Sequence, residues 1–168
     1  MVGLIRTSTL AIFLAITLVA GGLTGCANQV PAPNAALGPD GQPVVPGTAR
    51  DFSINVGNTV YFTTDSWDLT PDAQQTLRNQ ATWLNQYPQF TILVEGHADE
   101  RGTREYNIAL GARRAATVRD FLTAQGINAA RMRTISYGKE RPVAVCDDIS
   151  CWSQNRRSVT QLNERAGS

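Results

Sequence analysis

Apolar side chains recur at helical spacing through a long stretch in the middle of the chain. Tyr106, Leu110, Arg114, Val118 and Leu122 follow one another at four-residue intervals, and all of them except the arginine are apolar or aromatic. Residues at this spacing lie in one inclined row on a helix surface. The row therefore predicts a long helix whose inner face carries one arginine toward the core.

A second, shorter helix is predicted before the long one. Thr70, Pro71 and Asp72 form a typical helix start, with a capping hydroxyl, a proline at the first helical position and an acid in the first turn. Tyr87-Pro88 should end this helix, because a residue before proline avoids helical geometry. Its apolar face consists of Ala73, Leu77, Ala81 and Leu84.

Short segments with apolar or β-branched residues indicate strands at 60–62, 90–94, 132–137 and, with poorer alternation, 157–162. Thr103 is placed to cap the long helix and Gly126 to end it. The predicted order is βαβα followed by two strands, which is an α+β domain with a mixed sheet. Both helices should pack on one face of the sheet, because each helix has a single apolar side.

Arg114 is the member of the inner row that cannot give up its charge, so it needs an anion or a route to water. The loop before the long helix carries Asp99 and Glu100. Two interpretations are open at this point. Arg114 and Asp99 can form an internal salt bridge, as buried charges commonly do, or they can act together on a zwitterionic ligand.

The N-terminal segment has the pattern of a secretory signal. Its single charge, Arg6, precedes an apolar run at 10–20 and then small residues up to Cys26. The run is too short for a transmembrane span. Leu23-Thr24-Gly25-Cys26 resembles the bacterial lipobox, which implies acylation of Cys26 and, because Ala27 is not an aspartate, delivery to the outer membrane. An ordinary signal peptide beside a chance cysteine is the alternative.

Composition divides the chain into parts. Residues 1–25 are the predicted signal peptide. Residues 26–50 are rich in Pro, Gly, Ala and Asn and nearly free of charge, which is typical of a flexible tether behind a lipidated N-terminus. Residues 51–168 are predicted to form one folded domain, in keeping with the length of 168 residues.

Cys146 and Cys151 form an even pair once Cys26 is assigned to lipid. Export would place the pair in an oxidising compartment, which favours a structural disulfide over two free thiols. The pair does not predict a zinc site, because two further ligands are missing and the chain has a single histidine, His97.

The charge balance argues against nucleic-acid binding, because charged residues make up 17% of the chain and the formal net charge is +1. Catalysis has little support either. His97, Asp99 and Glu100 are close in sequence, but no serine or cysteine accompanies a histidine and an acid in a recognisable arrangement. We therefore expect no catalytic residue, metal or cofactor, and we interpret His97 as a hydrogen-bonded core residue. Besides a ligand-binding protein and an enzyme, a third class of function is possible, namely a structural lipoprotein that binds only protein partners.

The long helix also carries a family pattern. The order Asn107-x₂-Leu110-Gly111-x₂-Arg114-Ala115-x₂-Val118-x₃-Leu122 resembles the signature of OmpA-like peptidoglycan-binding domains, with Gly111 where serine is also common. The segments 96–103, 136–140 and 155–157 fit the same βαβαββ domain. Together with the lipobox and the tether, the pattern is similar to the OmpA-like lipoproteins of the Tol–Pal system.

This resemblance implies an outer-membrane lipoprotein whose periplasmic domain binds the diaminopimelate of peptidoglycan stem peptides without hydrolysing it. The implied partners are peptidoglycan, the inner leaflet of the outer membrane through the lipid anchor, and the Tol proteins TolB and TolA. The implied roles are envelope integrity and cell division.

Asp99 and Arg114 match the family's main ligand pair. The end group of diaminopimelate carries an ammonium, which suits Asp99, and a carboxylate, which suits the fork of Arg114. Phe62 and Asp65 fall where the family has an FDFD-like segment, which reads Phe62-Thr63-Thr64-Asp65 here. The resemblance therefore implies ligand contacts from Phe62 and Asp65, although the two threonines depart from the pattern. Asn107 and Leu110 are expected to orient the loop and pack the helix.

Overall fold

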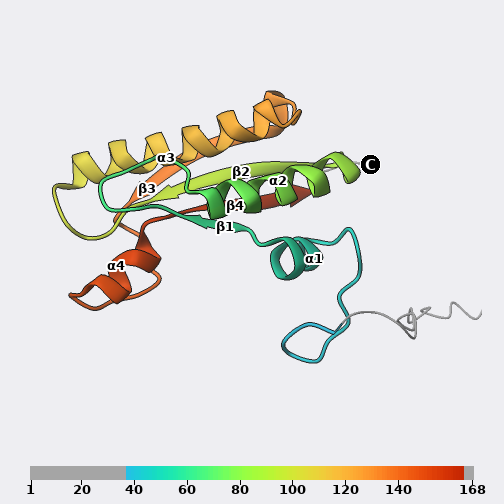
Figure 1. The fold of residues 1–168 in the computed structure, drawn as a ribbon, viewed down its shortest axis with the longest axis horizontal. Helices are drawn as coiled ribbons and strands as arrows, with labels where there is room; N and C mark the ends of the chain where they lie inside the picture. Colours follow the sequence, from blue (N-terminus) through green and yellow to red (C-terminus); the bar gives the residue numbers. More distant parts are fainter. Residues whose placement is uncertain (1–36, 165–168) are drawn as a thin grey trace, which may run out of the picture. The chain divides into compact units, whose positions relative to one another are not determined.

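The strands form one open mixed sheet, which confirms the predicted α+β architecture (Figure 1). The computed structural model describes residues 37–164, so the predicted signal peptide and Cys26 lie outside the described residues. The strand order is β1-β4-β2-β3. The antiparallel pairs join β4 (Arg157–Glu164) to both β1 (Thr59–Tyr61) and β2 (Phe90–His97), and the parallel pair joins β2 to β3 (Met132–Gly138).

The two long helices are α2 (Pro71–Gln86) and α3 (Arg104–Ala124). Both begin where the sequence predicts. The hydroxyl of Thr70 accepts a hydrogen bond from the Ala73 N–H, and Thr103 accepts one from Tyr106. After α3 the chain turns at Gly126, whose φ of 92° is the left-handed conformation that glycine supplies at helix ends.

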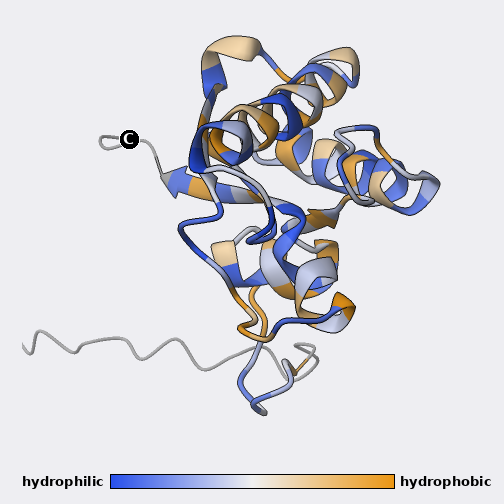
Figure 2. Cartoon of the chain, turned by 90° about the vertical axis from the view of Figure 1, so that its left-hand side faces the viewer, coloured by the Kyte–Doolittle hydropathy of each residue, from blue (hydrophilic) through white to orange (hydrophobic). Residues whose placement is uncertain are grey.

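Both helices pack on one face of the sheet, as predicted. The helix-facing residues of β2 join the apolar stripes of α2 and α3 in one buried cluster. Hydrophobic and hydrophilic residues alternate along both helices (Figure 2). The buried residues of each helix recur at intervals of three and four, so they lie on one side of it. Each fully buried leucine in this cluster contributes about 2 kcal/mol through the removal of apolar surface from water. The main contributors are Phe90, Ile92, Val94, Leu77, Leu84, Val118 and Leu122.

The folded part begins earlier than the predicted boundary at residue 51. Val44, within the predicted tether, is buried, and the short helix α1 (Ala49–Asp51) leads into the π-helical turn η1 (Phe52–Val56). Thr48 caps α1 by accepting a hydrogen bond from the Asp51 N–H. Residues 44–50 are therefore part of the domain rather than of a free linker.

A buried carboxylate attaches this N-terminal segment to α2. Asp51 accepts hydrogen bonds of 2.8 Å from the Trp83 indole and from the Gly47 N–H. Burial raises the pKa of Asp51, but hydrogen bonds from Trp83, Gly47 and Asn55 outweigh it and bring the pKa below its usual value. The ring of Phe52 packs against Trp83 with centroids 5.0 Å apart. The segment is thus held by both polar and apolar contacts.

The segment between β3 and β4 contains the predicted disulfide between Cys146 and Cys151. It also contains a helix that the sequence did not predict, α4 (Ile149–Asn155). Asp148 caps this helix by accepting a hydrogen bond from the Ser150 N–H. The short turn before β3 is a 3₁₀ helix, η2 (Ala129–Arg131).

Candidate ligand-binding site

A pocket of about 250 Å³ lies where the loops after β1 and β2 meet the first half of α3. Three of the four predicted ligand residues line it, namely Asp65, Asp99 and Arg114. Arg101 and Tyr106, to which the sequence analysis assigned no ligand role, line it as well. The pocket therefore combines carboxylates and guanidinium groups, which is the chemistry that a zwitterion requires.

Arg114 forms the base of the pocket and is 0% exposed. Its guanidinium donates to backbone carbonyls on three sides: Nε to Ser66 (2.8 Å), Nη1 to His97 (2.8 Å) and Nη2 to Thr63 (3.2 Å). The internal salt bridge with Asp99 is not formed. Burial, the largest influence, lowers the pKa of Arg114 to about 10, so the group is cationic at neutral pH. Each Nη nitrogen carries a second N–H group, which leaves donors for a ligand.

Asp99 is also buried, and two other arginines surround it. Its Oδ1 accepts from the backbone N–H and Nε of Arg101, both at 3.3 Å. Its Oδ2 accepts from Arg101 Nη2 at 2.7 Å and from Arg156 Nη1 at 3.3 Å. Burial alone would raise the pKa of Asp99, but the two arginines bring it below its usual value. A ligand ammonium must therefore displace one arginine, and Arg101 is the one with an exposed side chain.

Phe62 is not among the residues that line the pocket. Its side chain is buried, and its ring centroid lies 5.1 Å from Cζ of Arg114. Its carbonyl accepts a hydrogen bond of 3.2 Å from Nε of Arg156. Phe62 thus packs beneath one arginine of the site and orients another.

Asp65 and Tyr106 join the two sides of the pocket. The Tyr106 hydroxyl donates to the Asp65 carboxylate, which connects the loop after β1 to α3. Asp65 has a φ of 54° and is the only non-glycine residue with a positive φ in the described part of the chain. Such a conformation is held by surrounding contacts and is common at binding sites.

The loop after β2 is held as the sequence analysis expected. The side chain of Asn107 donates to the Arg101 carbonyl at 2.7 Å, which confirms its role in orienting the loop. Lys139 adds hydrogen bonds to the carbonyls of Glu100 (3.0 Å) and Gly102 (2.7 Å). Arg156 is a third residue, after Arg101 and Tyr106, that sequence reasoning missed, although it lies within the segment 155–157 that carried the family resemblance.

His97 is a core residue, as expected, but it is not hydrogen-bonded through its side chain. The residue is 1% exposed, and neither ring nitrogen makes a hydrogen bond within the described part of the chain, although Nε2 lies 3.5 Å from Oε2 of Glu95. The ring lies against Tyr137, with centroids 5.5 Å apart. Burial, assisted by Arg157 and Arg141, lowers the pKa of His97 to about 4. His97 is therefore neutral in the folded protein at neutral pH.

The buried neutral histidine should make the domain less stable in mild acid. Below its ordinary pKa of about 6.5 the unfolded state takes up a proton, whereas the folded state does so only near pH 4. The free energy of unfolding should therefore fall by roughly 1–3 kcal/mol as the pH decreases through this window. Urea unfolding at pH values between 6.5 and 4 should show this decrease in the free energy of unfolding for the wild type, and the decrease should be absent in His97→Phe. Asp51 and Asp99, whose pKa values are lowered, act only in stronger acid. If the free energy of unfolding depends on pH in the same way in both proteins, His97 is not the group responsible.

The chain is similar to known proteins over most of its length. The OmpA family matches residues 61–156 of the chain. The peptidoglycan-associated lipoprotein of Agrobacterium fabrum is 63% identical over 153 residues, which cover 89% of this chain and 85% of the relative. The chain belongs to the OmpA family, among its peptidoglycan-associated lipoproteins. The Pseudomonas aeruginosa protein of the same name is 41% identical over 156 residues, covering 86% of this chain and 92% of the relative.

Solved structures share the fold. The crystal structure of the peptidoglycan-associated lipoprotein from Burkholderia pseudomallei has a TM-score of 0.62 and 43% identity, and covers 63% of this chain and 90% of that one. The C-terminal domain of Helicobacter pylori MotB has a TM-score of 0.60, with 65% of this chain and 86% of that one covered. Its 23% identity supports the fold alone.

The relatives are named peptidoglycan-associated lipoproteins and not enzymes, in agreement with the sequence analysis. Across residues 37–164, no helix is long and apolar enough to cross a membrane.

Proposed function

We propose that the pocket binds the diaminopimelate residue of peptidoglycan stem peptides and thereby holds the outer membrane to the cell wall. The observation that carries this proposal is the placement of Arg114 and Asp99 in one pocket without a bond between them. An internal salt bridge would have satisfied both groups. Instead Arg114 keeps donors on both Nη nitrogens, and Asp99 is paired with an arginine that can move.

The charged groups that line the pocket suit a zwitterionic end group. Arg114 and Arg101 provide donors for a carboxylate, and Asp65 and Asp99 provide acceptors for an ammonium. Charge-assisted contacts of this kind are shorter and about twice as strong as neutral hydrogen bonds. A ligand ammonium on Asp99 would free Arg101 to contact the neighbouring ligand carboxylate, so both ends of the zwitterion would be paired.

Ligand entry requires a local rearrangement, because Arg114 is inaccessible to solvent. The exposed side chain of Arg101 and the Asp65–Tyr106 contact belong to residues that line the same pocket. Both are formed by surface side chains and can open without disturbing the core. The backbone bonds of Arg114 stay in place and keep its guanidinium oriented.

The remaining parts of the proposal concern the location and partners of the domain. Acylation of Cys26 would anchor the chain in the inner leaflet of the outer membrane, with the domain in the periplasm. The family relation further suggests that the protein acts in the Tol–Pal system with Tol proteins, in envelope integrity and cell division.

Co-sedimentation with purified peptidoglycan sacculi tests the binding proposal. The protein should pellet with sacculi that contain diaminopimelate, and free diaminopimelate should compete. A stem peptide with lysine in place of diaminopimelate is the matched competitor, because its free side-chain end keeps the ammonium and lacks the carboxylate, and it should compete poorly. No binding to sacculi, or equal competition by the lysine peptide, would overturn the proposal and favour a lipoprotein that binds only proteins.

The anchor is tested at Cys26. Cys26→Ser should leave an unacylated precursor that no longer fractionates with the outer membrane, because the acylated thiol is the source of lipid attachment. Metabolic labelling with a fatty acid and membrane fractionation provide the readouts. Label uptake by the serine variant would show that the lipid is attached elsewhere.

A further inference from the structure

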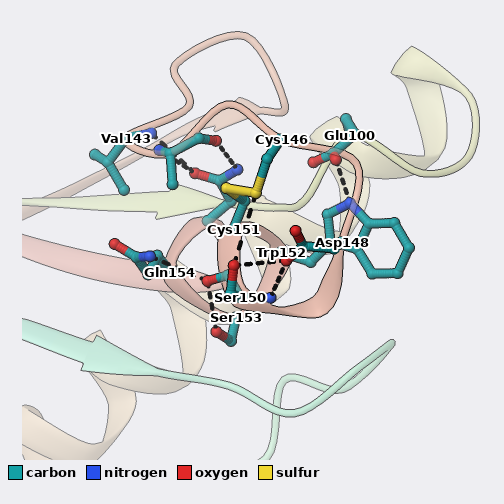
Figure 3. The surroundings of a disulfide bond; sticks show 11 residues. Glu100, Val143, Cys146, Asp148, Ser150, Cys151, Trp152, Ser153 and Gln154 are labelled. Atoms are coloured by element: carbon teal, nitrogen blue, oxygen red, sulfur yellow. Dashed lines mark hydrogen bonds between the residues drawn. A yellow bond between two sulfur atoms is a disulfide. The ribbon is translucent and has the colours of Figure 1, made fainter.

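Helix α4 contacts the binding pocket from its outer side. The Trp152 indole N–H donates to the carboxylate of Glu100 (Figure 3), and Cζ of Arg101 lies 4.3 Å from the centroid of the Trp152 ring. Trp152 therefore contacts two consecutive residues of the loop that carries Asp99. Arg156, directly after α4, contacts Asp99 itself.

The start of α4 is fixed by the disulfide. Cys151 immediately precedes Trp152, and its bond to Cys146 joins the helix to the loop before it. At the other end of the helix, the buried side chain of Asn155 accepts hydrogen bonds from the N–H groups of Val143 (2.9 Å) and Ala144 (3.2 Å). The disulfide and Asn155 thus hold the same helix against the same loop at two points.

We propose that Trp152 is a positioning residue for Arg101, and that the Cys146–Cys151 disulfide makes ligand binding sensitive to thiol reduction. The proposal rests on the proposed function, because the quantity it regulates is binding at the pocket. Arg101 has a long, partly exposed side chain whose freedom must be restricted before it can contact the ligand carboxylate beside Asp99. The Trp152 ring restricts it from one side, and the Glu100 contact holds the backbone of the loop to the indole.

The disulfide is accessible to a reductant. Cys146 lines a second pocket, of about 350 Å³, together with Glu100 and Lys139, whereas Cys151 is 8% exposed. A thiolate of a dithiol reductant can attack Sγ of Cys146, and Cys151 leaves as a thiolate that takes up a proton. The second thiol of the reductant then releases Cys146 as a thiol, and the reductant becomes a disulfide. In total, two electrons and two protons pass from the dithiol to the Cys146–Cys151 disulfide.

Reduction should loosen the site without unfolding the domain. The main core cluster lies between the sheet and helices α2 and α3 and includes no residue of α4. The bonds of Asn155 still hold the C-terminal half of α4. We therefore expect reduction to increase the motion of Trp152 and Arg101 and to weaken binding, with the fold retained.

The experiment measures sacculus binding of the full chain before and after treatment with a dithiol. Loss of the ring–cation contact corresponds to roughly fivefold weaker binding. Trp152→Ala should show the same loss without a reductant, and Trp152→Phe should recover most of it because the ring is kept. Ile149→Ala, an exposed position on the same helix, should bind like the wild type. A Cys146→Ser/Cys151→Ser double variant should bind weakly and be insensitive to the dithiol.

A double-mutant cycle with Arg101 separates positioning from general destabilisation. If Trp152 acts through Arg101, adding Trp152→Ala to Arg101→Ala should leave binding unchanged, whereas a global effect would add to it. Unchanged binding on reduction, or additive losses in the cycle, would overturn the proposal.

Hydrogen exchange of residues 98–103 provides a readout that needs no peptidoglycan. Exchange in this loop should become faster in the reduced protein and in Trp152→Ala. If wild-type protein fails to bind sacculi while this exchange still changes, the proposed function is at fault and the coupling stands. If binding is normal and the exchange does not respond, the coupling is wrong.

Discussion

Replacing Arg114 with alanine should remove most peptidoglycan binding and lower the stability of the domain at the same time. The binding loss should be about 2–4 kcal/mol, because a ligand carboxylate would lose its charge-assisted partner. Stability should fall because the carbonyls of Thr63, Ser66 and His97 lose their donor, and a buried unsatisfied polar group costs about 1–3 kcal/mol. The side chain proposed to bind the ligand thus also connects the loop after β1 to the end of β2.

A matched set of variants separates these two effects. Arg114→Lys keeps the charge but loses the planar fork, so it should recover part of the stability and little of the binding. Asp99→Ala should weaken binding about as much as Arg114→Ala, and the double variant should be little worse than either, because the ligand is no longer oriented. Thermal melts followed by circular dichroism and sacculus co-sedimentation on the same proteins are the measurements. Wild-type affinity in folded Arg114→Ala would remove this residue from the site.

Gly96→Ala should be among the most destabilising single substitutions in the domain. A Cβ on Gly96 would lie 1.8 Å from the carbonyl oxygen of Gly111, so β2 and α3 would have to separate. Overpacking of side chains costs about 1–3 kcal/mol, and a clash with backbone should reach or exceed the upper end. Peptidoglycan binding should fall as well, because the next residue, His97, supplies a carbonyl to Arg114.

Gly111→Ala is the matched control on the other side of this contact. Its Cβ would meet the Ser136 hydroxyl at 2.4 Å and the Gly96 carbonyl oxygen at 2.8 Å. Rotation of the hydroxyl would cost its hydrogen bonds with the Ile108 carbonyl and the Gly138 N–H. The backbone contact at 2.8 Å needs a smaller shift than the contact at 1.8 Å, so the loss in free energy of unfolding should be smaller than for Gly96→Ala. Urea unfolding of the two variants gives the comparison. Equal losses would show that β2 and α3 can separate easily.

The sequence predicted the features that depend on local spacing. The row through Arg114 placed this residue on the buried side of α3, and the capping residues located both long helices. The open choice between a salt bridge and a ligand site depended on long-range contacts. Arg114 bonds to carbonyls in the loop after β1, and Asp99 pairs with Arg156 from the far end of the chain. Spacing along the chain contains no information about such pairs.

The position and direction of the Phe62 side chain could have been predicted by combining the family resemblance with the strand pattern. The resemblance indicated that the segment lies near the ligand, but not where each side chain points. Alternation did contain that information, because Val60 and Phe62 are buried while Tyr61 between them is 53% exposed. The early start of the domain had no comparable signal, since it depends on the contact of Asp51 with Trp83 across 32 residues.

The attachment of the N-terminal segment to α2 has a mechanical consequence. A pulling force applied to the chain before residue 44 would first load the contacts of Val44, Asp51 and Phe52 with the body of the domain. Only if those contacts failed would tension reach β1, which pairs with β4 through just three residue pairs, and then the loop that supplies carbonyls to Arg114. Residues 44–52 should therefore bear a force carried by the N-terminal part of the chain before that force reaches the ligand pocket.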